Sequence, residues 1–374
     1  MNSDLKSQIE IALSKVSDPE LHRPITELGM VASIEVLGDT VTLKILLTIA
    51  GCPMRERLQK DISDAAKVPG ISKVEINFGV MNDEERNRVK SLLRGGREKF
   101  IPFAQPGSLT RVIAIASGKG GVGKSSITVN LAVELAKRGL KVGLLDGDVY
   151  GHSIPRALGI EGKRPTAIDQ TFIPIEAHGI KTVSIEMFKP DRADPVAYRG
   201  PLLHRVLEQL LSDAYWGDLD YLLLDLPPGT GDIAISLGQL IPNSEIIVVT
   251  TPQVAAAEVA ERAGRIAHQL KQRLIGVIEN MSAYTPIGAN APIALFGEGG
   301  GEETARRLSN LVGADIQLLG SIPFDPALRI GGDSGMPIVT SDPNSESASA
   351  IAKIVDQLVS GKRSLLGVKL GLST

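Results

Sequence analysis

The strongest constraint on the fold is a glycine-rich segment, Gly118-Lys-Gly-Gly-Val-Gly-Lys-Ser125, which follows the apolar run 112–116 and precedes a helical pattern. Glycines let consecutive backbone N–H groups curve around a phosphate without Cβ clashes, and the following helix adds the positive end of its dipole. A plain strand–helix turn is the alternative, but the spacing predicts a phosphate-binding loop for a triphosphate, with Lys124 on the β- and γ-phosphates and Ser125 on Mg²⁺. The residues expected to contact nucleotide are Gly118, Lys119, Gly120, Gly121, Val122, Gly123, Lys124, Ser125 and Ser126.

The composition excludes several classes of protein. The 374 residues, 43% of them apolar, are enough for one large domain and one small one. A net charge of −3 predicts no broad nucleic-acid binding, and a single cysteine excludes a disulfide framework or an all-cysteine metal cage within one chain. No leader-like segment or membrane-length apolar run is present, so we expect a soluble, cytoplasmic protein.

The first 93 residues predict a small α+β domain. Apolar spacing indicates helices at 5–16, 53–67 and 84–93, and alternation indicates strands near 31–36, 41–47 and 74–78. Residues 94–109, with glycines, prolines and no period, are the predicted linker. Cys52 falls where a strand ends and a helix begins, a place that favours a thiolate, although a small buried residue at a turn explains it equally well.

Residues 110–361 predict a doubly wound, mostly parallel sheet, followed by a tail at 362–374. The predicted strands are apolar without alternation and are separated by helices, a pattern typical of sheets with ligand loops at their carboxyl edge. Asp225 follows one strand and is expected to hold Mg²⁺ through water, with Asp146 supporting the same ion. Asn280 ends another strand and offers a donor and an acceptor to adenine. Turn-forming Asp and Asn residues are the alternatives.

Lys119 carries a resemblance to a known group. The string Lys119-Gly-Gly-Val-Gly-Lys124 resembles the deviant Walker A motif of the partition, arsenite-pump, nitrogenase-iron-protein and Mrp ATPases. In that group the extra lysine crosses a nucleotide-sandwich dimer, so the resemblance implies a homodimer in which Lys119 contacts phosphates on the other subunit. It also implies that Asp148, in the matching switch I segment, positions the attacking water, that 226–232 is switch II, and that Asn280 reads adenine.

The chain as a whole resembles the Mrp-type iron–sulfur cluster carrier ATPases. Asp18-Pro-Glu20 and Thr48-Ile-Ala-Gly-Cys-Pro53 are similar to an iron–sulfur assembly domain, whose hallmark cysteine falls at Cys52. Glu279-Asn-Met-Ser282 and Phe296-Gly-Glu-Gly-Gly-Gly301 are similar to later motifs of the family. The resemblance implies ATP-dependent binding of a [4Fe–4S] cluster and its transfer to apoproteins or assembly proteins. No Gln or Glu occupies an obvious water-activating place, so we expect slow hydrolysis that serves a conformational change.

One departure from that family leaves the function open. Many members carry Cys-x-x-Cys where this chain has 283–295, which contains no cysteine. A dimer offers only two Cys52 thiols, whereas an all-cysteine cluster needs four, and the five histidines show no ligand-type spacing. Three hypotheses remain: a cluster-assembly ATPase of altered ligation, a nucleotide-switched positioning or partition protein, and a docking scaffold. The basic, apolar tail contains Gly367 and Gly371, which weaken any helix, so membrane docking is not expected.

Overall fold

The computed structural model describes residues 2–48, 54–93, 100–105, 107–148, 151, 153–168, 171–188, 200–229, 232–286, 288 and 291–361. The chain divides into two compact units. The first contains Met1–Phe100 together with Thr166–Ile173, and the second contains Ile101–Pro165 and Pro174–Thr374. Cys52, residues 94–99 and 106 of the predicted linker, and the predicted tail lie outside the described residues.

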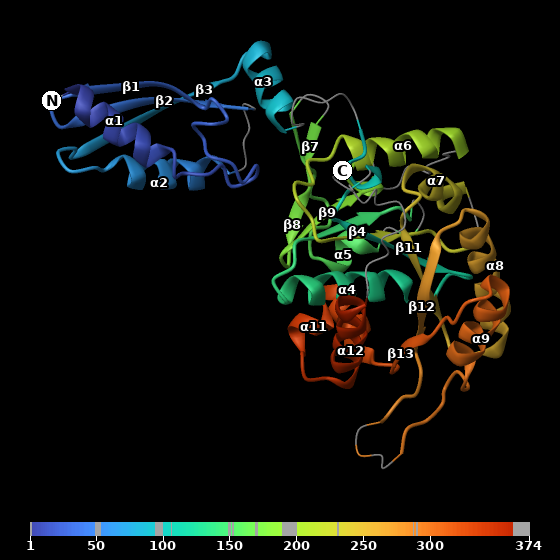
Figure 1. Cartoon of the computed structure of the whole chain (residues 1–374). Helices are drawn as coiled ribbons and strands as arrows, with labels where there is room; N and C mark the ends of the chain where they lie inside the picture. Colours follow the sequence, from blue (N-terminus) through green and yellow to red (C-terminus); the bar gives the residue numbers. More distant parts are fainter. Residues whose placement is uncertain are drawn as a thin grey trace, which may run out of the picture. The chain divides into compact units, whose positions relative to one another are not determined.

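The first unit is a three-stranded sheet covered on one face by two helices (Figure 1). The strand order is β1-β2-β3, with β1 antiparallel to β2 and β2 parallel to β3. Alternate residues of β2 point into the core, as the sequence pattern predicts. The elements are α1 (Asn2–Leu13), β1 (Val31–Leu37), β2 (Thr40–Leu47), α2 (Arg55–Ala66), β3 (Lys73–Val80) and α3 (Asp83–Leu93).

Two features of this unit differ from the sequence pattern. Helix α1 ends at Leu13 rather than Val16, because the N–H groups of Lys15 and Val16 bond to carbonyls only three residues back and close a tighter turn. A short hairpin, β6 (Thr166–Ile168) and β7 (Thr171–Ile173), belongs to this unit although it follows the phosphate loop in sequence.

The hairpin is joined to the rest of the first unit by a hydrogen bond. The Thr166 hydroxyl donates to the Glu20 carboxylate over 2.8 Å. Burial raises the pKa of Glu20 above its ordinary value, and the Thr166 bond offsets part of that rise. Ile168 in the same hairpin is fully buried, so the hairpin is held by apolar packing as well.

The second unit is built on an eight-stranded sheet of order β13-β12-β11-β4-β10-β5-β9-β8. All neighbouring pairs are parallel except β8 with β9, which confirms the predicted doubly wound, mostly parallel fold. The central strands β10 and β11 are buried along their whole length, and β4 is buried after its first residue, which explains their unalternating apolar sequences. The strands are β4 (Arg111–Ser117), β5 (Val142–Asp146), β8 (Ile175–Ala177), β9 (Ile180–Ser184), β10 (Tyr221–Asp225), β11 (Glu245–Thr250), β12 (Arg273–Asn280) and β13 (Leu318–Ile322).

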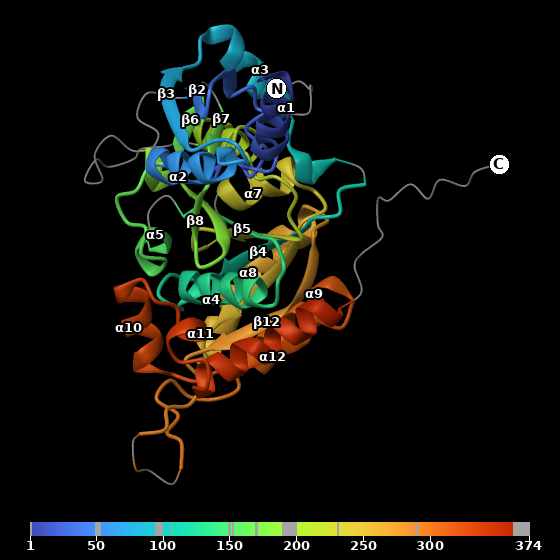
Figure 2. The same cartoon turned by 90° about the vertical axis from the view of Figure 1, so that its left-hand side faces the viewer.

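Helices cover both faces of this sheet. Figure 2 shows α4, α11 and α12 on one side of β4 and β5, and Figure 1 shows α6 and α7 on the other side of β4. Helices α8 and α9 pack on each other and on β11 and β12, while the short α5 packs on α10. The helices are α4 (Lys124–Lys137), α5 (Ile154–Ala157), α6 (Gly200–Ser212), α7 (Asp232–Leu240), α8 (Val254–Gln269), α9 (Gly300–Val312), α10 (Pro326–Ser334), α11 (Ile338–Ser341) and α12 (Glu346–Ser360), with 3₁₀ turns at η1 (Pro102–Ala104) and η2 (Ile185–Phe188).

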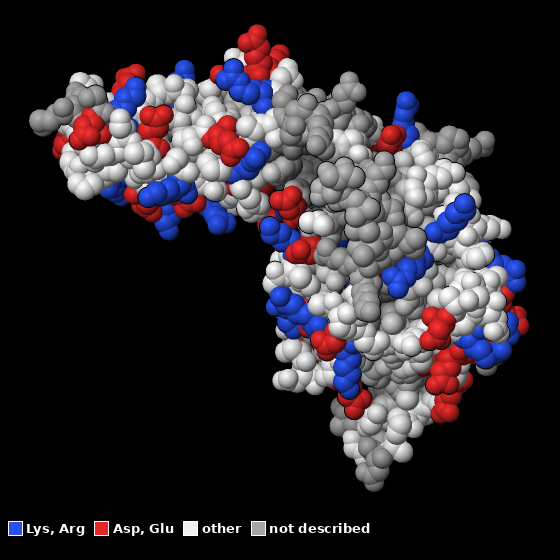
Figure 3. Space-filling view, in the orientation of Figure 1, with Lys and Arg blue, Asp and Glu red and all other residues white. Residues whose placement is uncertain are grey.

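The described surface carries charges of both signs. On the face shown in Figure 3, basic and acidic side chains lie interspersed over each unit. In α9, Glu303 pairs with Arg306 and Arg307, each over 2.7 Å. Of the helices in the described part of the chain, none combines the length and the apolar character needed to cross a membrane.

Candidate nucleotide-binding site

The predicted phosphate loop lies between β4 and α4, at the carboxyl edge of the sheet. Gly121 and Gly123 have φ values of 79° and 80°, a left-handed conformation that favours glycine. Gly118 is required for a different reason, because a side-chain Cβ at this position would collide with the α8 backbone at Val259. Gly121 and Gly123 are therefore required by the curvature of the loop, and Gly118 by its packing on α8.

Lys124 and Asp225 form a buried ion pair beside this loop. Parallel pairing of β10 with β4 and β5 brings the carboxyl end of β10 next to the start of α4. The Lys124 Nζ lies 2.7 Å from the Asp225 Oδ2, with the two side chains 5% and 0% exposed. The Ser125 hydroxyl donates to the same oxygen over 2.6 Å, and the Thr128 hydroxyl lies 2.8 Å from Oδ1. Asp225 thus has a donor on each carboxylate oxygen.

Asp146 lies beside Asp225, because the two residues are register partners on β5 and β10. Its Oδ2 accepts a hydrogen bond from the Ser184 hydroxyl over 2.8 Å, and its Oδ1 accepts one from the Asp148 N–H over 3.0 Å. Burial, followed by repulsion from Asp225, raises the pKa of Asp146 to about 7. A cation bound between these two adjacent buried carboxylates would reduce the repulsion between their negative charges.

The oxygen donors gathered here fit magnesium. Asp225, Asp146 and the Ser125 hydroxyl supply the hard oxygen ligands that Mg²⁺ prefers, directly or through water. Within the described ranges, no group of three or more His, Cys, Asp or Glu side chains could hold a metal alone. Mg²⁺ is commonly held by one or two carboxylates, with water and phosphate oxygens completing its shell. The donor set therefore suits a magnesium ion that arrives with a nucleotide.

Asp148 and Lys119 are the two residues singled out by resemblance, and their side chains bind different partners. The Asp148 Oδ1 accepts a hydrogen bond from the Gly151 N–H over 3.0 Å, which ties this carboxylate to its own loop after β5. The Lys119 Nζ donates to the Gln253 Oε1 over 2.8 Å, at the residue that precedes α8. The second lysine of the motif is thus turned toward α8, whereas Lys124 is turned toward Asp225.

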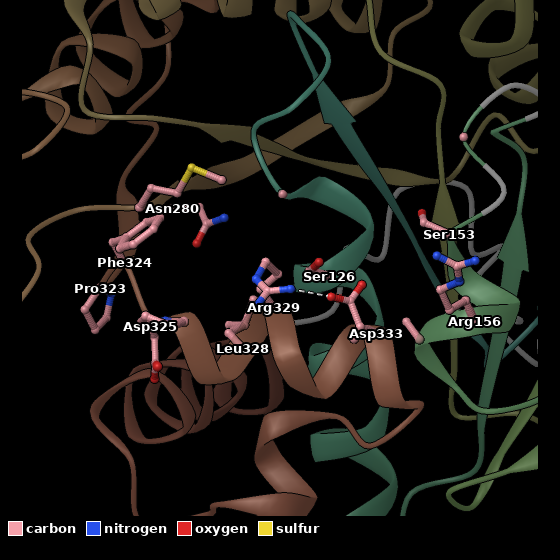
Figure 4. A pocket seen from close by; sticks show the side chains of 16 residues that line it. Ser126, Ser153, Arg156, Asn280, Pro323, Phe324, Asp325, Leu328, Arg329 and Asp333 are labelled. Carbon is pink, nitrogen blue, oxygen red and sulfur yellow. Dashed lines mark hydrogen bonds and ion pairs between the residues drawn. The ribbon is translucent and has the colours of Figure 1, made fainter.

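A pocket of about 570 Å³ adjoins the end of the phosphate loop (Figure 4). Asn280 and Phe324 lie at one end of it, Ser126 lies near its middle, and Arg156 lies at the other end. The Asn280 Nδ2 donates to the Val122 carbonyl over 2.9 Å, so the loop itself orients the amide. An adenine base needs both an apolar surface and a few placed polar groups, and this pocket supplies them.

Several residues of the site have no counterpart in the sequence prediction. Thr128 lies one helical turn after Lys124, and this i+4 spacing is the sequence signal that places it on the same helix face as Lys124, near Asp225. Gln253 and Phe324 come from distant segments, and their approach depends on tertiary packing. Ser184 reaches Asp146 only because β9 pairs with β5.

The site has a glycine-rich loop between a central parallel strand and a helix, carboxylates at the ends of neighbouring strands, and a pocket beside the loop. These features define a P-loop NTPase. The comparisons with known proteins give the same class. The family described as NUBPL iron-transfer P-loop NTPase matches residues 108–359, and the family described as iron–sulfur cluster assembly protein matches residues 6–78. The chain belongs to the NUBPL iron-transfer P-loop NTPase family.

Two relatives that match nearly the whole chain share one name. A protein of Mycobacterium leprae named iron–sulfur cluster carrier protein is 56% identical over 374 residues, covering 99% of this chain and 97% of the relative. A protein of the same name from Synechocystis is 39% identical over 360 residues, covering 94% and 96%. A solved nucleotide-binding protein from Archaeoglobus fulgidus, in complex with ADP, is 36% identical with a TM-score of 0.51, covering 60% of this chain and 86% of that one.

Proposed function

We propose that this protein is an ATP-binding and ATP-hydrolysing iron–sulfur cluster carrier or assembly factor that acts as a nucleotide-switched homodimer in the cytoplasm. The proposed nucleotide binding is supported by one observation: Lys124 and Ser125 both contact the Asp225 carboxylate beside the glycine loop. The cluster as cargo rests on the names of the relatives and on the matched assembly family. We further propose the domain limits 1–93, 94–109 for the linker, 110–361 for the ATPase and 362–374 for the tail.

In this proposal each group of the site has one task. The N–H groups of 118–123 and the Lys124 amine hold the phosphates, while Asn280 and its pocket hold the adenine. Ser125 and Asp225, with Asp146 behind them, hold the magnesium ion. Magnesium, when bound, neutralises charge that develops on the phosphates. Lys124 must leave Asp225 to reach the phosphates, so nucleotide binding rearranges the buried ion pair.

The second part of the proposal is the dimer cycle. Two subunits close on two nucleotides, and the Lys119 amine leaves Gln253 to contact the phosphates bound by the other subunit. Asp148 orients the attacking water, and loss of the γ-phosphate lets the loop after Asp225 move and reopens the dimer. Hydrolysis is slow, because no Gln or Glu occupies an obvious water-activating place in the sequence, and it serves this change of conformation. The paired lysines of the loop support this division of roles.

The cargo part of the proposal depends on Cys52, the one cysteine of the chain. Two such thiols in a dimer leave two positions of a [4Fe–4S] cluster to other ligands, to a small thiol or to a recipient apoprotein. The test is anaerobic reconstitution of the full chain with iron and sulfide, followed by iron counting and spectroscopy. Wild type and Cys52→Ala are compared, and both must bind ADP equally so that loss of fold is excluded.

The outcomes separate the hypotheses. A cluster that disappears with Cys52 supports the carrier function and locates the cargo. A wild-type protein that binds nucleotide but no cluster removes the cargo and favours a positioning or partition-type ATPase, or a docking scaffold. Liposome flotation with ATP tests whether the protein is a membrane-bound positioning ATPase.

A further inference from the structure

The Asp225 carboxylate has three hydrogen-bonding or ionic partners, and they are not equivalent. Lys124 and Ser125 both contact Oδ2, over 2.7 and 2.6 Å, whereas Thr128 contacts Oδ1 over 2.8 Å. In the proposed function Lys124 turns to the phosphates and Ser125 turns to the magnesium ion. Thr128 is then the partner that stays on Asp225 throughout.

Thr128 is built into the core rather than placed at a surface. Its side chain is 0% exposed, on the second turn of α4, one turn after Lys124. The same hydroxyl lies 2.9 Å from the Lys124 carbonyl, the usual contact of a helical threonine with the residue four positions earlier. A hydroxyl has one hydrogen, and a carboxylate accepts it more strongly than a carbonyl does. The geometry therefore directs the Thr128 hydrogen toward Asp225.

A donor on Oδ1 decides where Oδ2 points. The terminal torsion of an aspartate is broad, so a carboxylate without fixed partners rotates. With Oδ1 held by Thr128, the other oxygen faces Ser125, the side on which magnesium is bound in the proposed function. Asp225 is 0% exposed, so water cannot easily replace a lost donor.

We propose that Thr128 is a positioning residue for magnesium: its hydroxyl holds the Asp225 carboxylate in the orientation that receives the ion. This role rests on the proposed nucleotide and magnesium site, and it adds to that site a residue outside the phosphate-loop motif. It predicts an effect on magnesium-dependent nucleotide binding, and none on nucleotide binding without the ion.

The test is Thr128→Val in the full-length protein, because valine keeps the shape and removes the hydroxyl. Fluorescent ADP is titrated in EDTA and at increasing Mg²⁺, which gives the dissociation constant without the ion and the Mg²⁺ concentration at half-effect. We expect the first value to stay within about two-fold of wild type and the second to rise about ten-fold, equivalent to about 1.4 kcal/mol. Thr128→Ser, which keeps the donor, should restore the wild-type Mg²⁺ dependence.

Thr304 provides the matched control. It is also 0% exposed and helical, and its hydroxyl donates to the carbonyl of Gly300, four residues earlier, over 2.7 Å. Thr304→Val therefore makes the same chemical change at a buried helical position, and it removes a hydroxyl that donates to a backbone carbonyl rather than to Asp225. Its Mg²⁺ dependence should equal that of wild type.

Three results would overturn the proposal. Thr128→Val with wild-type Mg²⁺ dependence removes the positioning role, and so does an equal loss of ADP affinity in EDTA and in Mg²⁺, which indicates damaged packing. Failure of Thr128→Ser to restore the dependence has the same meaning. If Thr128→Val is not recovered as folded protein, Thr128→Ala is judged by the same titration. A wild-type protein without Mg²⁺-dependent ADP binding refutes the proposed site itself, which is a distinguishable outcome.

Discussion

Replacing Asp225 with asparagine should strengthen nucleotide binding when magnesium is absent. In the structure Asp225 holds the Lys124 amine over 2.7 Å in a fully buried position, and that amine must move to reach a phosphate. The asparagine side chain would keep the shape and accept hydrogen bonds at its carbonyl oxygen, while its NH₂ group only donates, and it would no longer carry the charge that retains Lys124. The same change removes a negative charge that repels the incoming phosphates.

The size of the effect follows from the geometry. At an effective dielectric constant of about 20, two unit charges 2.7 Å apart attract by about 6 kcal/mol. Most of this attraction energy, lost when Lys124 leaves Asp225, is recovered when Lys124 contacts the phosphates. Asp225 also keeps the Thr128 hydroxyl as a donor. A net gain of about 2 kcal/mol is expected for Asp225→Asn, which corresponds to roughly thirty-fold tighter binding.

Calorimetric titration of ADP in EDTA measures this gain directly. Adding Mg²⁺ should reverse the order, because wild type gains affinity from an ion that Asp225→Asn holds poorly. Asp356→Asn is the matched control, since Asp356 is 69% exposed and pairs with Arg138 on the surface over 2.6 Å. If Asp225→Asn binds ADP more weakly than wild type in EDTA while Asp356→Asn is unchanged, the ion pair does not oppose phosphate binding and the reasoning fails.

Three further predictions concern other parts of the site. Lys124→Ala should abolish ADP and ATP binding, whereas Lys119→Ala should keep binding and lose ATP turnover in a phosphate-release assay; equal loss of binding in both contradicts separate roles. Because the pKa of Asp146 is raised from 3.8 to about 7, the folded chain holds a proton between about pH 4 and 7 that the unfolded chain has released, so this residue lowers stability as pH rises through that window. In EDTA, Asp146→Asn should therefore raise the melting temperature by an amount that grows up to about pH 7, while the shift caused by Glu303→Gln, whose pKa is lowered to about 2, should stay constant from pH 5 to 8. Asn280→Ala should weaken ADP binding about ten-fold and GDP binding less, and an unchanged ADP-to-GDP ratio in competition titrations would remove Asn280 from base recognition.

The sequence predicts the parts of the site that depend on local backbone geometry and on strand register. The phosphate loop needs left-handed glycines at 121 and 123, and these residues are visible as a motif. Asp146 and Asp225 each end an apolar strand, and parallel pairing then places them side by side. The roles assigned to these residues in nucleotide binding stay predictions until they are measured.

The parts that the sequence does not predict depend on contacts between distant segments. The hairpin at 166–173 lies in the sequence between α5 and β8, yet it belongs to the first compact unit. Its two strands have three residues each, too few for a hydrophobic pattern that would indicate which unit they pack on. Gln253 likewise carries no local mark of its contact with Lys119, because that contact exists only once α8 packs against the phosphate loop.

The cysteine-free segment is linked to the nucleotide pocket by an aromatic cluster. The Tyr284 and Phe296 rings, near the two ends of 283–295, lie 5.8 and 5.9 Å from the Phe324 ring. Tyr284 and Ile293 exchange two backbone hydrogen bonds of 2.9 and 2.8 Å, so the segment has its own closed base. Phe324 also lines the pocket that contains Asn280. The Phe324 ring is therefore shared by the pocket and by the aromatic cluster at the base of the 283–295 segment, so the pocket and this segment are joined by direct side-chain packing.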